Sequence, residues 1–254
     1  SIDLDTAVVE VLSATTSAAG NITIAETAAG LNILLTSVVT NNGNITVTTA
    51  AGTINVDSVV ANGAASIATL TATGGAIEEV AAGDVGADIT GATITLTAAA
   101  GIGTTGTAPI EIDASSLSAN STAGAINLND TANGVTVNAT NVTTAGGQID
   151  LTATGGTLTL VGNVTTNLAN NINLTGTGIA QTAGTVSTAT GTITLDGNDG
   201  AISTAGTITT TGAGAITIID GTTFTQTAGA IGSATTTTLT IGTAGANNFS
   251  NAIT

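Results

Sequence analysis

The sequence has no Lys, Arg, His, Cys, Met, Trp or Tyr, so its 16 Asp and Glu residues give a formal charge of −16 with no basic side chain to balance it. Binding of nucleic acid requires Lys and Arg against phosphate. Nucleophilic catalysis by a thiol or an imidazole requires Cys or His, and structural zinc sites use the same two residue types as ligands. These three functions are therefore excluded, as are disulfide bonds.

Long apolar segments are absent too. No run of about 18 apolar residues occurs, and no basic segment precedes an apolar one, so we expect neither a membrane span nor a signal peptide. The chain is still 42% apolar with a mean hydropathy of +0.49, whereas disordered acidic chains have low hydrophobicity. Because Thr, Val and Ile are abundant and helix formers such as Lys and Arg are missing, we expect an all-β fold.

An internal repeat predicts the architecture. The motif Ile-x-(Leu/Ile/Val) recurs at a nearly constant spacing over much of the chain. Its members in the C-terminal half are Ile126, Ile149, Ile172, Ile193, Ile216 and Leu239, and those in the N-terminal half are Ile2, Ile22, Ile45 and Ile94, with Ile67 as a weaker member. Taken as one row, they predict about eleven turns of roughly 20–23 residues, a period within the range of repeat proteins.

Each turn contains three short segments in which apolar and polar residues alternate. After Ile149, the second segment begins near Leu158 and the third near Val164, with Gly-rich corners between them. Strands too short to fold alone, repeated at a fixed period, are typical of a β-solenoid. We predict one domain over 1–254, an all-β, three-sheet parallel β-helix that is right-handed, as parallel crossovers generally are. A β-sandwich also has many short strands, but it lacks this period.

The row has two longer intervals, from Ile67 to Ile94 and from Ile94 to Ile126, which predict loop-bearing turns at about 67–125. Six carboxylates fall within them: Glu78, Glu79, Asp84, Asp88, Glu111 and Asp113. Together with Asp196 and Asp199 of the corner DGNDG, they are candidate ligands for Ca²⁺, which binds oxygen atoms. The alternatives are solvated acidic loops that keep the protein soluble and, beside Gly, ordinary turn residues. We predict no enzyme and no cofactor other than Ca²⁺.

Outward hydroxyl and amide groups form a third pattern. Their pairs are Asn141/Thr143, Asn163/Thr165, Thr185/Ser187 and Thr207/Thr209, one pair in each turn. Such an array is similar to the ice-binding face of several antifreeze proteins, although hydroxyl and amide ladders also simply stack between parallel turns. A ligand-binding solenoid, for calcium or for ice, is therefore the alternative to a structural protein.

Two segments resemble a known family. The runs at 91–130 (GATITLTAAAGIGTTGTAPIEIDASSLSANSTAGAINLND) and 146–163 (GGQIDLTATGGTLTLVGN) are similar to the repeats of large bacterial adhesins of the filamentous haemagglutinin type. The resemblance implies a right-handed β-helical shaft and a structural or adhesive role outside the cell, at the bacterial surface. It supplies no catalytic residues, and the complete lack of Lys and Arg departs from such shafts.

The two ends of the chain carry no obvious cap. Asp3 and Asp5 alternate with Ile2 and Leu4 in the first segment, and the last segment contains Phe249 and Ile253. An uncapped solenoid exposes a row of unpaired N–H and C=O groups. We therefore expect end-to-end assembly, either as a head-to-tail homopolymer or with the remainder of a longer adhesin. The host or neighbouring cell surface that such a fibre would contact is not indicated.

Overall fold

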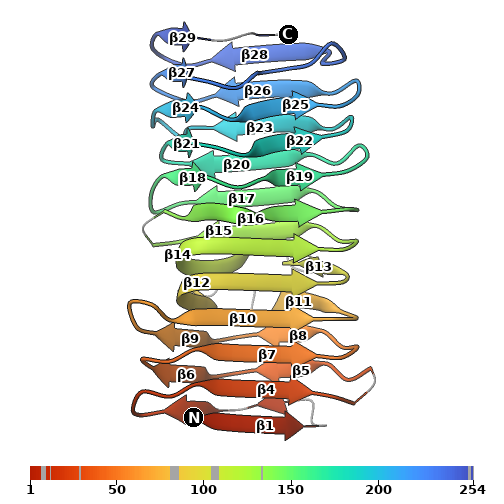
Figure 1. Cartoon of the computed structure of the whole chain (residues 1–254), viewed down its shortest axis with the longest axis vertical. Helices are drawn as coiled ribbons and strands as arrows, with labels where there is room; N and C mark the ends of the chain where they lie inside the picture. The colour runs from red at the N-terminus through yellow and green to blue at the C-terminus, as the bar shows by residue number, and fades with distance from the viewer. Residues whose placement is uncertain are drawn as a thin grey trace.

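The computed structural model describes residues 1–6, 10–11, 13–28, 30–80, 86–103, 109–132, 134–250 and 253. Every regular element in this part of the chain is a β-strand, and all of the strand pairs are parallel. The strands stack as a β-solenoid of about ten turns, with the two termini at opposite ends of the rod (Figure 1). This confirms the predicted fold class, while the right-handed winding stays a prediction.

Three columns of strands run along the rod, and the chain visits them in a fixed order. Sheet 1 contains β1 (Ile2–Thr6), β4 (Ile22–Glu26), β7 (Ile45–Thr49), β10 (Ile67–Ala72), the C-terminal parts of β12 (Ile89–Ala98), β14 (Ile110–Ser121) and β16 (Thr136–Thr144), then β19 (Val164–Thr166), β22 (Thr185–Thr188) and β25 (Thr207–Thr210). Figure 1 shows β4, β7, β10 and β12 one above another with nearly parallel arrows.

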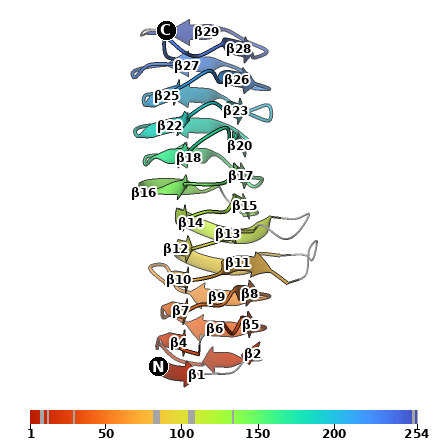
Figure 2. The same ribbon diagram turned by 90° about the vertical axis from the view of Figure 1, so that its right-hand side faces the viewer.

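The other two columns complete each turn. Sheet 2 contains β2 (Glu10–Val11), β5 (Ile33–Leu35), β8 (Ile54–Val56), β11 (Ala76–Glu79), β13 (Gly101–Ile102), β15 (Ile126–Asp130), β17 (Ile149–Ala153), β20 (Ile172–Gly176), β23 (Thr192–Asp196), β26 (Ala215–Ile219) and β28 (Thr238–Gly242). Sheet 3 contains β3 (Ala14–Thr16), β6 (Val38–Asn41), β9 (Val59–Asn62), the N-terminal parts of β12, β14 and β16, then β18 (Leu158–Leu160), β21 (Ile179–Gln181), β24 (Ile202–Thr204), β27 (Phe224–Gln226) and β29 (Asn247–Phe249). Sheets 2 and 3 join at the start of β14, because residues 110–112 also pair with residues 128–130 of β15. Figure 2 shows β5, β8 and β11 stacked in the same way.

The predicted row of Ile-x-(Leu/Ile/Val) motifs is wrong in register. Ile94 pairs with Leu117 in sheet 1, and not with Ile126. Ile126 lies in sheet 2, where it pairs with Ile102 on one side and with Ile149 on the other. The early and late members of the row therefore belong to different sheets, and the interval from Ile94 to Ile126 is not a long turn.

Ile67 was also assigned wrongly, because Ala68 and not Ile67 pairs with Ile45. One longer turn remains in sheet 1, since the step along the chain from Ala68 to its partner Ile94 is longer than the step from Ile45 to Ala68. The additional residues fall between β11 and β12, and a further extension falls between β13 and β14. Sheet 1 keeps its pairing through both turns.

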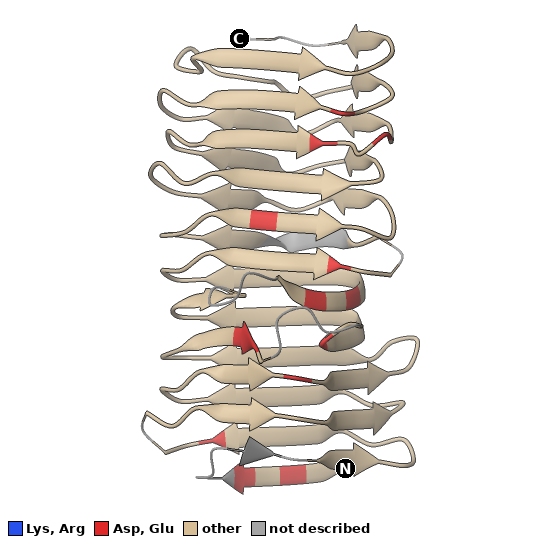
Figure 3. Ribbon diagram, turned by 180° about the vertical axis from the view of Figure 1, so that it is seen from behind, with Lys and Arg blue, Asp and Glu red and all other residues tan. Residues whose placement is uncertain are grey.

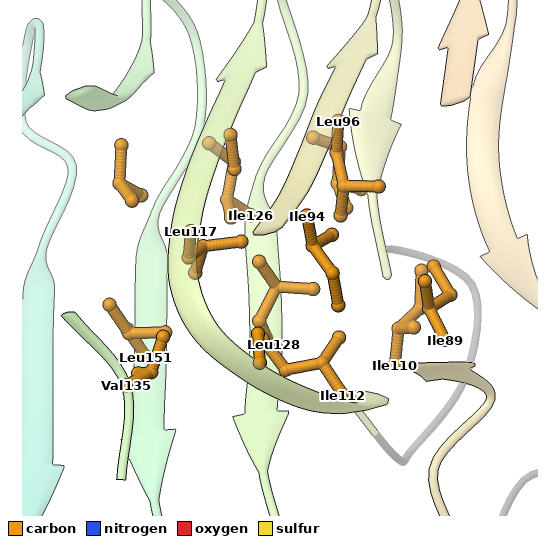
Figure 4. Close-up of a cluster of buried hydrophobic side chains, with 14 of the residues drawn as sticks. Ile89, Ile94, Leu96, Ile110, Ile112, Leu117, Ile126, Leu128, Val135 and Leu151 are labelled. Carbon is orange, nitrogen blue, oxygen red and sulfur yellow. The ribbon is translucent and has the colours of Figure 1, made fainter. Parts of the chain in front are cut away.

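The core is a continuous column of aliphatic side chains. Most strands alternate, as in β17, where Ile149, Leu151 and Ala153 are buried and the residues between them are not. Figure 4 shows side chains of β12, β14 and β15 turned toward one another inside the rod. Each fully buried Ile, Leu or Val contributes about 1.5–3 kcal/mol, so this column dominates the stability. No helix in the described part of the chain is long and apolar enough to cross a membrane.

Candidate functional site

Three carboxylates from two successive turns converge at one place. Glu79 ends β11, Asp88 precedes β12, and Glu111 lies in β14, one turn later. Each offers one oxygen atom, and these three atoms lie within 4.8 Å of one another. Asp88 is buried, with 2% of its surface exposed, whereas Glu79 and Glu111 are half-buried. The group thus combines residues of β11, of β14 and of the segment just before β12, from two successive turns.

Backbone hydrogen bonds fix Asp88 and Glu111 relative to each other. The Glu111 amide donates to Asp88 Oδ2 at 2.9 Å. The Asp88 amide donates to the Glu111 carbonyl, also at 2.9 Å, and the Asp88 carbonyl accepts from Val59 at 2.7 Å. Asp88 is therefore held by two neighbouring turns, and its position is set by the parallel ladder rather than by a free loop.

The chemistry of this acidic triad suits a hard cation. Ca²⁺ takes six to eight oxygen ligands at about 2.3–2.6 Å, and oxygen atoms within 4.8 Å of one another can share one ion. The sequence contains no Lys, Arg or His, so no basic side chain of this chain neutralises the triad. Ionised carboxylates at such separations disfavour one another, and a divalent cation would relieve this repulsion.

The other predicted ligands of the longer turns do not join the triad. Glu78 is half-buried in β11, one residue before Glu79. Asp113 lies two residues after Glu111 and lines a separate open depression of about 400 Å³ together with Asn62, Thr90 and Ser115. Asp84 falls outside the described residues. Alternation and corner geometry, which the spacing of acidic residues does not reveal, decide which carboxylates meet.

The corner DGNDG is a turn. The Asn198 amide donates to Asp196 Oδ1 at 3.0 Å, and the Gly200 amide donates to the Gly197 carbonyl at 2.7 Å. Asp199 is exposed and has a φ of 65°. The Asp196 side chain thus hydrogen-bonds to the backbone of its own turn, as Asp and Asn side chains commonly do. Among the described residues, Asp196 and Asp199 do not form part of a group of three converging ligands.

Asp130 is a buried carboxyl group that the repeat did not indicate, because it occupies an inward position at the end of β15. Its Oδ1 accepts a hydrogen bond from the Ala114 amide at 3.2 Å. Burial raises the pKa of Asp130 above its usual value of 3.8, and the charge of Asp113 acts in the same direction, while the amides of Ala114 and Gly134 oppose the shift. The signal in the sequence that could have indicated this buried carboxyl group is a polar residue at the last inward position of a predicted strand.

The corrected register extends the outward ladder of sheet 1. Thr143 pairs with Asn120, which joins the late turns to the early ones. One file of outward residues runs through Thr48, Thr71, Thr97, Asn120, Thr143, Thr165, Ser187 and Thr209. A second file beside it contains Thr23, Thr46, Thr69, Thr95 and Ser118. We call these two files the threonine face.

Acidic residues lie elsewhere. From β4 to β25 the outward residues of sheet 1 include no Asp or Glu, and Glu26, at the end of β4, is buried. Asp150 and Asp196 are on sheet 2, and the acidic triad is beside sheets 2 and 3. Figure 3 shows the rod from behind, with segments of acidic residues in red and none of basic residues in blue. The rod thus has one neutral hydroxyl-rich side.

Comparisons with known proteins add no family to this description. No protein-family model matches the chain, and neither a curated protein nor a solved structure does.

Proposed function

We propose that the chain is a structural, non-catalytic segment of an extracellular fibre or adhesin at a bacterial surface, which extends end to end through its terminal turns. The next turn would come from a second copy of the chain or from the remainder of a longer protein. The resemblance of its repeats to haemagglutinin-type adhesins supports the extracellular location. The parallel solenoid supports end-to-end extension, because each turn packs only against the turns before and after it.

The terminal turns carry the observation on which this proposal rests. Leu4 is 37% exposed, whereas Ile24, its partner in the next turn, is fully buried. At the other end, Phe249 is 42% and Ile253 is 45% exposed. Among the described residues, β1 pairs with β4 alone and β28 pairs with β26 alone. Apolar side chains and open strand edges are thus presented together at both ends, which favours axial stacking.

Axial association of the purified chain tests this proposal. Electron microscopy and analytical ultracentrifugation should show rods that lengthen with protein concentration while their width stays constant. Because an isolated segment of a longer shaft exposes the same apolar ends, both sources of the next turn give this result. Monodisperse rods of one length, with or without Ca²⁺, would overturn the proposal.

A pair of matched variants separates axial from lateral contact. Leu4→Lys places a charge on the terminal face and should weaken association. Leu168→Lys places the same charge on the corner between β19 and β20, where Leu168 is 68% exposed, and should leave the association unchanged. An equal effect of both substitutions would indicate nonspecific aggregation instead of stacking.

The acidic triad supports a second function, calcium binding between two successive turns. Glu79, Asp88 and Glu111 belong to two successive turns, so an ion among them would link these turns where the solenoid departs from its regular period. A ligand that binds only the folded state stabilises it by about 2.7 kcal/mol at a concentration of 100 times Kd. Calcium would then stabilise the part of the rod that contains these two turns.

Calorimetry and thermal unfolding test the calcium site. The wild-type chain should bind one Ca²⁺ with a rise in Tm, and Mg²⁺, which demands a tighter octahedral geometry, should bind more weakly. Glu111→Gln should abolish the calcium-dependent rise, whereas Asp113→Asn, two residues away and outside the triad, should preserve it. Loss of the rise in both variants would mean that calcium acts on the overall charge and not on this site.

A further inference from the structure

The threonine face is a regular surface of the rod that neither proposed function uses. Its most complete part consists of Thr46 and Thr48 on β7, Thr69 and Thr71 on β10, and Thr95 and Thr97 on β12. All six side chains point outward and are partly or fully exposed, between buried neighbours on the same strands. The parallel pairing places Thr46, Thr69 and Thr95 in one file, and Thr48, Thr71 and Thr97 in the other.

The hydroxyl groups of these six threonines are available to a ligand. None of them forms a hydrogen bond with another described residue, although many hydroxyls at the corners do, such as those of Thr40 and Thr49 with glycine carbonyls at 2.7 Å. Thr143 in the same file accepts from Asn120, at 2.7 Å, so intramolecular pairing begins only farther along the rod. The central part of the face therefore presents unpaired donors and acceptors at fixed positions.

The lattice of this face is set by the β-sheet. Neighbouring turns are about 4.8 Å apart, and residues i and i+2 of one strand are about 6.6 Å apart. Each lattice point carries a hydroxyl and a methyl group, held on a stiff β-branched side chain. These two repeats are similar to the distances between water oxygens on the prism planes of hexagonal ice. Water molecules bound to such hydroxyls and ordered around such methyls would already be arranged as in ice.

Other partners fit this face less well. Phosphate and nucleic acid need basic residues, and the chain has none. Sugar sites commonly contain aromatic side chains, but Phe224 is buried and Phe249 lies on β29 at the end of the rod. Protein interfaces depend on large apolar or Arg anchors, and Ile67 is the only strongly exposed large apolar residue of β7, β10 and β12. A neutral, hydroxylated, regular surface suits water itself.

We infer that the threonine face binds ice through ordered water held by Thr46, Thr48, Thr69, Thr71, Thr95 and Thr97. This activity goes beyond the fibre role and does not depend on axial assembly. The insertion of residues between β11 and β12 and between β13 and β14 leaves the pairing of β10, β12 and β14 intact, so the lattice continues across the irregular turns. Because the outward residues of sheet 1 from β4 to β25 include no carboxylate, no strongly hydrated charge disturbs the ordered water on this lattice.

Thermal hysteresis and inhibition of ice recrystallisation by the purified chain test this inference. The wild type should show both activities. Thr71→Tyr places a bulky ring in the centre of the lattice and should remove most of the hysteresis, and Thr71→Lys, which adds a hydrated charge at the same point, should do the same. Thr194→Tyr is the matched control, because Thr194 is an outward threonine of similar exposure on β23 in sheet 2. Its hysteresis should equal that of the wild type.

Circular dichroism and thermal unfolding establish that each variant remains folded. Absence of hysteresis in the folded wild-type chain would overturn the inference, as would an equal loss in the Thr71 and Thr194 variants. Binding to cellulose or chitin without any effect on ice growth would overturn it too, because the face would then be a polysaccharide surface.

Discussion

Asp130 shows how one inward polar residue changes the properties of a β-solenoid. Its position in β15 is equivalent to that of Ala153 in β17, which is fully buried. A carboxyl group placed there loses its hydration, so burial raises its pKa above 3.8. The hydrogen bond from Ala114 at 3.2 Å offsets only part of this cost.

The stability of the protein should therefore fall as the pH rises through the titration of Asp130. Well below pH 3.8 the carboxyl is protonated in the folded and the unfolded chain. Between 3.8 and the raised pKa of the folded state, the unfolded chain releases a proton that the folded chain keeps, so the free energy of unfolding decreases. Asp130→Asn retains an oxygen that can accept from Ala114 and removes this penalty, so its Tm at pH 7 should exceed that of the wild type.

Thermal unfolding at several pH values measures this effect. The Tm difference between Asp130→Asn and the wild type should be largest at neutral pH and should shrink below pH 3.8. Asp150→Asn is a suitable control, because Asp150 is an outward residue of β17 whose carboxylate accepts from Gln148 and Asn173. A Tm difference for Asp130→Asn that is independent of pH would contradict the assignment.

The corners between strands constrain which residues the fold accepts. Gly184, between β21 and β22, has a φ of +74°, which side-chain-bearing residues rarely adopt. A Cβ atom at this position would also overlap the Gly162 carbonyl of the preceding turn. The close approach of successive turns, and not chain flexibility, therefore requires glycine here.

Gly184→Ala should destabilise the protein by more than about 1 kcal/mol, because the left-handed backbone and the overlap both oppose alanine. Gly30 offers a control with the same backbone requirement, since its φ is +80° but no atom lies within 4 Å of the added Cβ. Urea unfolding should show a smaller loss for Gly30→Ala than for Gly184→Ala. Equal losses would mean that backbone conformation alone explains the cost.

Periodicity predicted the strands but not their pairing. The alternation in β17 or β20 is visible in the sequence, so strand type, inward faces and the stacked solenoid could be predicted. The register failed at β10, where Ala68 takes the position that Ile occupies in β4 and β7. Because all three sheets use the same Ile-x-(Leu/Ile/Val) pattern, a segment of sheet 1 cannot be distinguished from a segment of sheet 2 by its residues alone.

The same reason explains what could be predicted of the candidate sites. The sequence showed a group of acidic residues within the predicted longer turns, but only the parallel ladder shows that Asp88 lies against Glu111. Likewise, Thr165 and Thr209 were recognised as outward residues, whereas their continuation into Thr71 and Thr97 required the register. Contacts between turns depend on pairing between segments one full turn apart, and local pattern does not determine this pairing.

At the scale of the whole molecule, charge is the dominant imbalance. The net charge of −16 has no basic side chain to offset it, and like charges repel more strongly in the compact rod than in the expanded unfolded chain. The acidic residues are also unevenly distributed, since the threonine face contains none between β4 and β25. The repulsion is therefore concentrated on the sides formed by sheets 2 and 3.

Monovalent salt should stabilise the protein, because the screening length shortens from about 30 Å at 0.01 M to about 10 Å at 0.1 M. Differential scanning calorimetry in increasing NaCl at pH 7 should show a rising Tm, and the rise should disappear in strong acid, where the carboxylates are protonated. Glu111→Gln removes only one charge and should retain this NaCl effect while losing the additional rise in CaCl₂ at equal ionic strength. If Glu111→Gln responded to CaCl₂ as the wild type does, calcium would act by screening, and the triad would not be its site.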